Sequence, residues 1–356
     1  MALRALARVD TGAIARNCAT LRRTAGTRLC AVVKADGYGH GAVEAARAAR
    51  RGGAEWLAVA TAREAEQLRA AGLDGPLLVL GALSDEELPV ALAARADVAA
   101  WRRGFLDALP DGARVHVKLD TGMGRLGTRD AAEALDVARE AARRGMLAGA
   151  MTHFATSDDD PGFAREQLAR FAPWVAEVRA AAPGVLAHAA NSAAAIGIPE
   201  SRLDLVRCGI AIYGLDPFQA DPAAHGLEPA LTLATYVAEV KPVASGQSAG
   251  YGRRFVAEAP GWLATLPIGY ADGVRRGLTN NADVLIGGRR MPLAGTVSMD
   301  NITVLVPESV QRGQEAVLIG AQGEERILAE EVARRLQTIN YEVTCGISAR
   351  VPRAYG

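Results

Sequence analysis

The feature that most restricts the fold of this chain is an alternation of two kinds of segment over residues 1–227. Short apolar runs bounded by glycine or proline are typical of buried strands, and Ala/Arg/Glu-rich stretches with helical spacing lie between most of them. Eight such strand–helix units in succession predict an α/β fold, a parallel (β/α)8 TIM-like barrel, rather than an open sheet. The expected strands are Leu29–Val33, Trp56–Ala60, Leu77–Leu80, Asp97–Ala100, Val115–Leu119, Leu147–Thr152, Val185–Ala189 and Leu205–Ile212. The clearest expected helices are Ala42–Arg50, Ala62–Ala71, Ala131–Arg144 and Arg165–Ala182.

After Leu227 the pattern changes to a series of strand candidates separated by turn signals. Gly287-Gly288 follows the apolar run Val284–Ile286, and two glycines at such a place favour a tight hairpin. We therefore expect two domains, a barrel over 1–227 and a mainly β domain over 228–356, and we allow for the first few residues pairing with the second domain. The remaining candidates there are the strands Leu263–Ile268, Met291–Val297, Ile302–Val306 and Ala316–Ile319 and the helix Ala329–Leu336.

The overall charge is balanced, with 40 acidic and 40 basic residues, so composition favours neither a nucleic acid nor an anionic membrane as partner. No apolar run reaches about 18 residues, and the N-terminal MALRALARVD lacks the apolar stretch of a secretory signal. The four cysteines are scattered without a CxxC pair, which is typical of reduced structural thiols and indicates no metal site. We therefore expect a cytoplasmic protein that is not inserted in a membrane.

Lysine is rare in this chain, and one lysine stands in an unusual place. Only Lys34, Lys118 and Lys241 occur, while nearly all other basic residues are arginine. Lys34 follows an apolar run directly, in AVVKADGYGHG, and such flanks indicate a partly desolvated amine. Desolvation lowers the pKa of a lysine and frees its amine for Schiff-base chemistry, for which pyridoxal phosphate (PLP) is the commonest cofactor.

Other polar residues follow the expected barrel strands, at the ends where TIM-barrel chemistry collects. The eighth unit offers backbone N–H groups at Gly209 and Ile210, and these, with the hydroxyls of Ser192 and Tyr38, suit a dianionic phosphate. The residues at the remaining strand ends are Lys118, Asp120, His153, His188, Asn191 and Arg207.

Nine motifs follow one another along the chain: AVVKADGYGHG, KLDTGMGRLG, THFATSDD, AANSAA, VRCGIAIYG, AGYG, PIGYADG, GTVSMDN and NYEVTCGISARVPR. In these motifs and in their order the chain resembles the alanine racemase family over essentially its whole length. The resemblance implies a PLP-dependent enzyme with an N-terminal barrel and a C-terminal β domain. Such an enzyme interconverts L-alanine and D-alanine by a two-base mechanism and supplies D-alanine for cell-wall peptidoglycan.

The resemblance also implies roles for individual residues. Lys34 matches the lysine that carries the cofactor and moves a proton on one face of the substrate. Tyr251 matches the tyrosine of the opposite face, contributed across the interface of a homodimer with composite sites. Arg207 matches the arginine that faces the pyridine nitrogen, and His153 the histidine that links this arginine to the tyrosine.

Further matches concern binding. Arg125 and Met299 match the contacts to the substrate carboxylate, and Lys118 matches a lysine that is often carbamylated and then positions that arginine; an ion pair from Lys118 to Asp120 is the simpler alternative. His188 is expected to be structural. The matches to the phosphate contacts are Tyr38, Ser192, Gly209, Ile210 and Tyr341, and Tyr270 and Asp300 fall in motifs that line the site.

The chain departs from the family pattern at two places. Cys208 stands where the family usually has proline, and the pair Arg253-Arg254 follows Tyr251 where uncharged residues are usual. Two other functions remain open at this stage. One is a racemase of broader or different preference, including serine or basic amino acids, and the other is a barrel-only PLP-carrier protein, which lacks the β domain and the Tyr251 motif.

Overall fold

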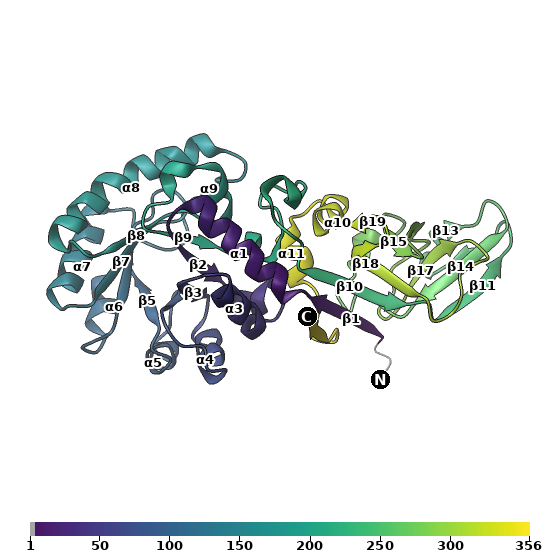
Figure 1. Ribbon diagram of the computed structural model, residues 1–356, viewed down its shortest axis with the longest axis horizontal. Coiled ribbons are helices and arrows are strands. Elements are labelled where there is room, and N and C mark those ends of the chain that lie inside the picture. Colours follow the sequence, from purple (N-terminus) through teal and green to yellow (C-terminus); the bar gives the residue numbers. More distant parts are fainter. Residues whose placement is uncertain (1–3) are drawn as a thin grey trace. The chain divides into compact units, whose positions relative to one another are not determined.

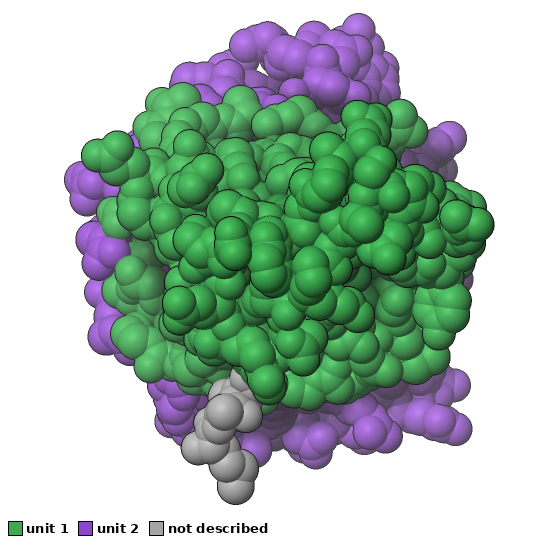
Figure 2. Space-filling view, turned by 90° about the vertical axis from the view of Figure 1, so that its right-hand side faces the viewer, with its two compact units in different colours: residues 1–13, 219–224, 228–356 green, residues 14–218, 225–227 purple. Residues whose placement is uncertain are grey.

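The computed structural model describes residues 4–356, and these divide into two compact units that Figure 2 shows in different colours. The barrel unit comprises residues 14–218 and 225–227, and the C-terminal unit comprises 4–13, 219–224 and 228–356. Each unit has its own buried core.

The barrel unit contains eight parallel strands, which confirms the predicted (β/α)8 fold. They are hydrogen-bonded in the order β8-β7-β6-β5-β4-β3-β2-β9, and helices surround them in Figure 1. The strands are β2 (Arg28–Val32), β3 (Trp56–Val59), β4 (Leu77–Val79), β5 (Asp97–Ala100), β6 (Val115–Lys118), β7 (Leu147–Met151), β8 (Leu186–His188) and β9 (Leu205–Cys208).

The helices of the barrel pack on the strands through small side chains. In α3 (Ala42–Arg51) the buried alanines 42, 45, 46 and 49 recur with helical spacing, so one apolar face is narrow and smooth. The others are α1 (Thr11–Ala25), α4 (Ala62–Ala70), α5 (Glu87–Ala93), α6 (Arg103–Asp107), α7 (Ala131–Arg143), α8 (Pro161–Ala181) and α9 (Ser192–Gly197). No helix within residues 4–356 is both long and apolar enough to cross a bilayer.

Two predicted strands end at least four residues earlier than expected. The run Leu205–Ile212 is a strand only as far as Cys208, and a 3-10 helix covers Ile210–Tyr213. Gly209 separates them with φ −105° and ψ −91°, which lies outside the extended region. The run Met291–Val297 is strand only in β16 (Arg289–Pro292), because the chain turns away from the sheet through Gly295 at φ +94°.

The C-terminal unit is mainly β, as predicted. Its main sheet has the order β16-β15-β18-β10-β1-β20, with β19 paired to β18, and smaller sheets join β11-β14-β17 and β12-β13. The strands are β1 (Ala5–Val9), β10 (Leu231–Tyr236), β11 (Glu239–Val243), β12 (Ser248–Ala249), β13 (Phe255–Val256), β14 (Gly261–Leu266), β15 (Asp283–Ile286), β17 (Ile302–Val306), β18 (Glu315–Gln322), β19 (Glu325–Ile327) and β20 (Arg353–Tyr355).

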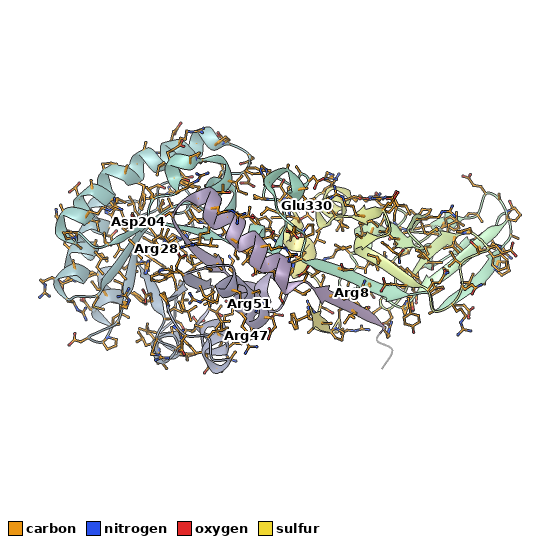
Figure 3. All side chains as sticks on the ribbon, in the orientation of Figure 1. Arg8, Arg28, Arg47, Arg51, Asp204 and Glu330 are labelled. Atoms are coloured by element: carbon orange, nitrogen blue, oxygen red, sulfur yellow. The ribbon has the colours of Figure 1, made fainter. Side chains whose placement is uncertain are left out.

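Local chemistry explains several of these connections. Gly287 and Gly288 have φ of +60° and +73°, which the tight β15–β16 hairpin requires and glycine tolerates. Arg8 of β1, labelled in Figure 3, forms an ion pair with Glu315 of β18 at 2.5 Å. The buried Glu330 accepts a hydrogen bond from Asn340 at 2.9 Å and so ties α10 (Ala329–Leu336) to α11 (Asn340–Cys345).

Candidate active site

Lys34 begins a turn of unusual backbone conformation directly after β2. Ala35, Asp36 and Gly37 have φ/ψ near +53/+51°, +50/+49° and +62/+42°, and Tyr38 follows with φ +52°. Four successive residues therefore lie in the left-handed region, which costs about 1–2 kcal/mol for each residue other than glycine. Such strain persists only where surrounding contacts hold it, and it gathers at functional sites.

Two carboxylates hold this turn. Glu64 of α4 accepts the backbone N–H of Ala35 at 2.7 Å through one oxygen, and the N–H groups of Ala60 and Thr61 at 2.8 and 3.1 Å through the other. The second carboxylate is that of Asp36, which accepts the N–H of Ala42 at 2.9 Å. The position of the Lys34 backbone is thereby fixed from both sides.

A cradle for an anion lies beside this turn. The Ser192 hydroxyl, at the start of α9, accepts the N–H groups of Gly209 and Ala211 at 3.0 and 3.4 Å. A Cβ on Gly209 would lie 2.3 Å from the Tyr38 hydroxyl oxygen, so that hydroxyl touches the bare Cα. The next residue, Ile210, opens the 3-10 helix, and four of the predicted phosphate contacts thus lie together.

Arg207 is almost completely buried and is held by neutral groups. Its Nη1 donates to His188 Nδ1 at 2.8 Å, and its Nη2 donates to the carbonyls of Thr152 and Ala189 and to His153 Nδ1, at 2.8, 3.0 and 3.2 Å. Burial lowers the pKa of its guanidinium to about 10, so the group stays cationic near neutrality. No partner of its Nε–H lies among residues 4–356, so this donor can serve a ligand.

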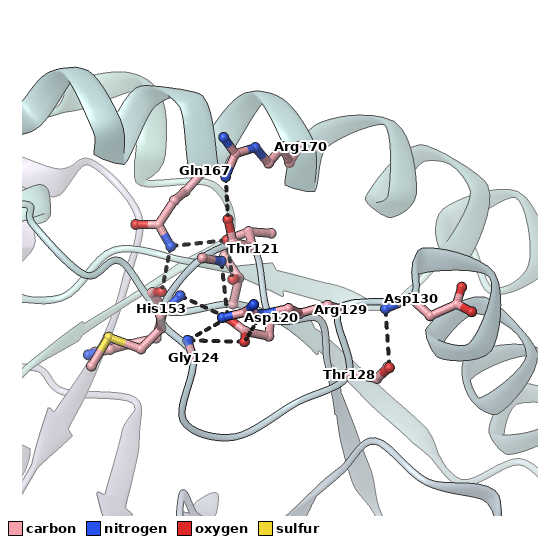
Figure 4. A network of polar contacts seen from close by, with 12 residues as sticks. Asp120, Thr121, Gly124, Thr128, Arg129, Asp130, His153, Gln167 and Arg170 are labelled. Carbon is pink, nitrogen blue, oxygen red and sulfur yellow. Dashed lines mark hydrogen bonds and ion pairs between the residues drawn. The ribbon is translucent and has the colours of Figure 1, made fainter.

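His153 is consequently neutral, with its proton on Nε2. Its Nδ1 accepts from Arg207, and burial, followed by the cations Arg207 and Lys118, lowers the pKa of the ring well below its usual value. Figure 4 shows how the loops after β6 and β7 are tied together here. The amide nitrogen of Gln167, on α8, donates to the His153 carbonyl at 3.2 Å and to the Thr121 hydroxyl at 3.3 Å.

Asp120 organises the loop that carries Arg125 and does not pair with Lys118. Its carboxylate accepts the backbone N–H groups of residues 122, 123 and 124 at 2.8–3.1 Å and an Arg129 N–H at 3.3 Å (Figure 4). Burial raises the pKa of this carboxyl, but the backbone hydrogen bonds outweigh burial and keep it below its usual value. Within residues 4–356 there is no Lys118–Asp120 ion pair.

Lys118 is the last residue of β6 and is buried. Burial, then the charges of Arg207 and Arg125, lower the pKa of its amine to about 8. About one such amine in ten is therefore neutral at pH 7. With Lys34 and the two arginines nearby, this end of the barrel is strongly cationic and suits a ligand with several negative charges.

The other predicted site residues belong to the C-terminal unit. Tyr251 is 74% exposed, and Met299 and Tyr270 are 52% and 41% exposed. The loops of Tyr270 and Met299 are joined, because the N–H of Tyr270 donates to the Ser298 carbonyl and the N–H of Ala271 to the Met299 carbonyl, both at 3.0 Å. Tyr341 is half-buried in α11, and Asp300 pairs with Arg350 at 2.7 Å.

Comparison with known proteins agrees with this arrangement. The family model described as the alanine racemase N-terminal domain matches residues 9–217, and the model of the C-terminal domain matches residues 230–355. The chain belongs to the alanine racemase family. A protein named alanine racemase from Symbiobacterium thermophilum is 46% identical to this chain, and the match covers 98% of this chain and 96% of the relative.

Solved structures of the alanine racemase family match as well. The enzyme from D-cycloserine-producing Streptomyces lavendulae has a TM-score of 0.94 at 38% identity, and the match covers 100% of this chain and 98% of that one. The Bacillus anthracis enzyme, solved with bound L-Ala-P, has a TM-score of 0.91 at 36% identity, with 100% and 96% covered. The predicted family and fold are therefore confirmed.

The alanine racemase family uses PLP, and the residues of the barrel unit fit that cofactor. PLP presents an aldehyde, a dianionic phosphate and a pyridine nitrogen that accepts a hydrogen bond. The half-buried Lys34 amine suits the aldehyde, the cradle beside Gly209 suits the phosphate, and the unpartnered Nε–H of Arg207 suits the nitrogen. The described residues hold no group of three or more His, Cys, Asp or Glu side chains able to bind a metal ion.

The departures from the family pattern are now located. Cys208 is completely buried at the end of β9, and burial raises the pKa of its thiol, which is therefore protonated. Arg253 and Arg254 are exposed beside Tyr251, and Arg253 donates to the Ser248 hydroxyl at 3.3 Å.

Sequence reasoning missed Glu64, Asp97 and His116. The spacing of Thr61 and Glu64 is a capping-box pattern, so the role of Glu64 in starting α4 was detectable, whereas its bond to Ala35 was not. Asp97 and His116 lie inside strands that are buried on both faces, where no alternation shows which side chains point into the barrel.

Proposed function

We propose that this chain interconverts L-alanine and D-alanine with PLP carried on Lys34, and that it supplies D-alanine for peptidoglycan. One observation carries the proposal: the Lys34 turn, the cradle at Ser192 and Gly209, and the free N–H of Arg207 lie at the carboxyl ends of strands of one barrel. Full-length similarity to proteins named alanine racemase supports alanine as substrate, as does the L-Ala-P bound to the Bacillus anthracis relative.

The barrel unit supplies most of the proposed cofactor site. Tyr38, Ser192, Gly209 and Ile210 would hold the phosphate together with Tyr341, and the Nε–H of Arg207 would hold the pyridine nitrogen. When bound, PLP withdraws electron density from the substrate Cα, so that the α-proton becomes acidic enough to leave. Arg207 can only donate, because guanidinium has no acceptor, and it keeps that ring nitrogen unprotonated.

Two side chains would move the proton. The Lys34 Nζ takes or returns it on one face of the substrate, and the Tyr251 phenolic oxygen does so on the other, which is what inversion of a stereocentre requires. The Nε2–H of His153 would donate to the Tyr251 oxygen and stabilise it when it has lost its proton. The neutral state of His153 leaves this N–H as its one donor.

We propose that the active form is a homodimer in which Tyr251 of one subunit completes the site of the other. A proton carrier works in a site closed to bulk water, yet Tyr251 is 74% exposed and Met299 is 52% exposed in the single chain. Large exposed apolar side chains on one unit are typical of a surface that a second copy covers. The Met299 backbone and Arg125 would bind the substrate carboxylate.

We further propose that Lys118 is carbamylated. A carbamate forms from a neutral amine and CO2, and the lowered pKa supplies that form near neutrality. The modification replaces a buried cation among cations by an anion able to hold Arg125 in place. Native mass spectrometry in bicarbonate buffer should show the added mass of one CO2. This mass should be absent from Lys118→Ala and present in Lys241→Ala, which replaces an exposed lysine.

We propose a cytoplasmic location. Cys18, Cys30 and Cys208 are buried free thiols, which persist in a reducing compartment. A barrel-only PLP carrier does not account for the C-terminal unit. The exposed Tyr251 of that unit supports catalysis instead. The alternative of a racemase that also accepts serine or basic amino acids is tested by assaying several amino acids.

The test is to incubate the purified chain with PLP and L-alanine and to follow D-alanine, with L-serine and L-arginine in parallel. Borohydride reduction should fix the cofactor to Lys34, which peptide mass mapping identifies. Lys34→Ala should bind no reducible cofactor, while Lys241→Ala should behave as the parent. Production of D-alanine by Lys34→Ala without added amine would overturn the proposal.

A further inference from the structure

A continuous row of buried polar side chains crosses the barrel interior below Arg207. His188 Nδ1 lies 2.8 Å from Arg207 Nη1, His188 Nε2 lies 2.7 Å from His116 Nδ1, and His116 Nε2 lies 3.1 Å from Asp97 Oδ2. Both histidines are completely buried. Barrel interiors are normally filled by branched apolar side chains, so this polar row is an exception.

The proton positions in the row follow from the chemistry of arginine. Guanidinium can only donate, so His188 Nδ1 accepts and the single proton of the neutral ring is on Nε2. That N–H donates to His116 Nδ1, and the proton of His116 must then be on Nε2, where it donates to Asp97. Every hydrogen bond therefore runs in one direction, from the guanidinium to the carboxylate, and both rings are neutral.

The barrel makes room for this row at a specific place. A Cβ on Gly149 of β7 would lie 2.1 Å from His116 Nδ1, so only glycine permits the ring to lie there. Trp56 of β3 covers the same ring edge-on, with 5.4 Å between ring centroids. The ring of His116 is thereby packed between Gly149 and Trp56, with its two nitrogens directed at His188 and Asp97.

The row ends in the carboxylate of Asp97, whereas the guanidinium of Arg207 has no carboxylate as a direct partner. Within residues 4–356, no Asp or Glu contacts Arg207, whose acceptors are carbonyls and imidazole nitrogens. Asp97 is 5% exposed, and the one further side chain among the described residues that forms an ion pair with it is Arg114, which is 58% exposed. An ion and its counter-ion joined through two polarised imidazoles hold each other more firmly than neutral groups do.

We propose that Asp97 and His116 are positioning residues for Arg207, and that they fix the guanidinium so that its free Nε–H points steadily at the cofactor's pyridine nitrogen. The link between Arg207 and PLP in this proposal rests on the proposed function, whereas the row of hydrogen bonds from Arg207 to Asp97 does not depend on it. His188 transmits the constraint between them. Asp97 acts from the far end of the barrel interior without touching cofactor or substrate.

The first test compares three variants for PLP affinity, kcat and KM. Asp97→Ala removes the terminal acceptor and should weaken PLP binding and lower kcat by about tenfold each, with KM for alanine changed less than twofold. Asp97→Asn keeps an acceptor oxygen without the charge and should recover part of both losses. Arg114→Ala removes the exposed neighbour of Asp97 outside the row and should match the parent.

A merely structural role makes a different prediction. In that case Asp97→Ala lowers the melting temperature but leaves PLP affinity, cofactor absorbance and kcat as in the parent, which would overturn the proposal. Equal effects of Asp97→Ala and Arg114→Ala would also overturn it, because the loss would then belong to the surface ion pair.

The second test needs no variant and no cofactor. Nitrogen-15 NMR of the histidine side chains in the unmodified protein at pH 7 should show His116 and His188 neutral, each with its proton on Nε2. A proton on Nδ1 of either ring, or a charged ring, breaks the row and refutes the proposal even if Asp97→Ala fails to fold. If the parent shows this pattern but binds no PLP, the function proposed above fails and the row remains.

Discussion

A Cβ on Gly209 would lie 2.3 Å from the hydroxyl oxygen of Tyr38, so the two residues exclude any side chain at residue 209. Gly209→Ala must therefore displace the Tyr38 hydroxyl from the cradle and strain the N–H that Gly209 donates to Ser192. We expect PLP affinity to fall about tenfold and the unfolding free energy to drop by about 1–3 kcal/mol. PLP titration by absorbance and thermal unfolding without PLP measure the two effects.

The matched control is Gly104→Ala in α6, where an added Cβ meets nothing within 4 Å. It should leave PLP affinity unchanged and raise the unfolding free energy by about 0.5–1 kcal/mol, because alanine favours a helix more than glycine does. If Gly209→Ala binds PLP as tightly as this control, the cradle is not the phosphate site.

The left-handed turn after Lys34 predicts a stabilising substitution. Ala35 has φ +53° and ψ +51°, a conformation that glycine adopts without the Cβ clash. Ala35→Gly should raise the unfolding free energy by about 0.5–1 kcal/mol, the relief of strain exceeding the added flexibility of the unfolded chain. Denaturant unfolding measures the change, and exposed Ala132→Gly in α7 should lower stability by a similar amount. A loss of stability in Ala35→Gly would show that the turn is not strained there.

Much of the fold follows from the sequence, because glycine-bounded apolar runs and helical spacing are local signals. β5 and α10 lie where they were predicted, and the Gly287-Gly288 hairpin needs only the freedom of two glycines. The left-handed turn is different, since Ala35 and Asp36 carry no preference for it, and contacts such as the hydrogen bond to Glu64, far away in sequence, help to hold it. Tertiary partners of this kind cannot be read from neighbours in the chain.

The same limit applies to the site. The sequence predicted that Lys34, Lys118 and Arg207 lie at strand ends, because they are charged residues within or directly after apolar runs. The break at Gly209 was not, because the run continues as Ile210–Ile212 in residues of strong β preference. A close approach by Tyr38, far away in sequence, decides the backbone there.

Lys118 predicts a pH dependence of stability. Its amine has a pKa of about 8 when folded, against 10.5 for the ordinary side chain. In CO2-free buffer below pH 8 the amine is charged in the folded chain, so the cost of burying that charge lowers the unfolding free energy by its full amount. As pH rises from 8 to 10.5, the unfolded chain still binds the proton that the folded chain has released, so the unfolding free energy gains up to about 3 kcal/mol.

Lys118→Met should therefore be more stable than the parent at pH 7, and the difference should shrink as pH rises through that window. Denaturant melts of both proteins at several pH values measure it. Lys241→Met, which removes an exposed amine, is the control and should follow the parent. A constant difference between Lys118→Met and the parent would mean that the folded amine titrates normally.

Asp120 predicts an effect on substrate binding, because its carboxylate holds three backbone N–H groups of the loop that carries Arg125. Asp120→Asn should raise KM for alanine about tenfold, with kcat reduced less, since Arg125 loses its fixed place. The folded pKa of Asp120 is lowered, so its stabilisation is present above about pH 3.9 and lost as pH falls through the folded value. Exposed Asp136→Asn serves as control, and an unchanged KM in Asp120→Asn would separate the loop from substrate binding.

The exposure of Tyr251 predicts that two inactive chains restore activity together. Lys34→Ala and Tyr251→Phe each lack one proton carrier, so each homodimer alone should racemise at a small fraction of the parent rate. If Tyr251 serves the neighbouring subunit, random mixing after dissociation makes half of the dimers hybrids, each with one intact and one doubly defective site. Activity should then recover to about a quarter of the parent value. Chiral assay of D-alanine before and after mixing measures it, and each variant mixed with itself should stay inactive. No recovery, with hybrid dimers verified by mass, would mean that each chain builds its site from its own Lys34 and Tyr251.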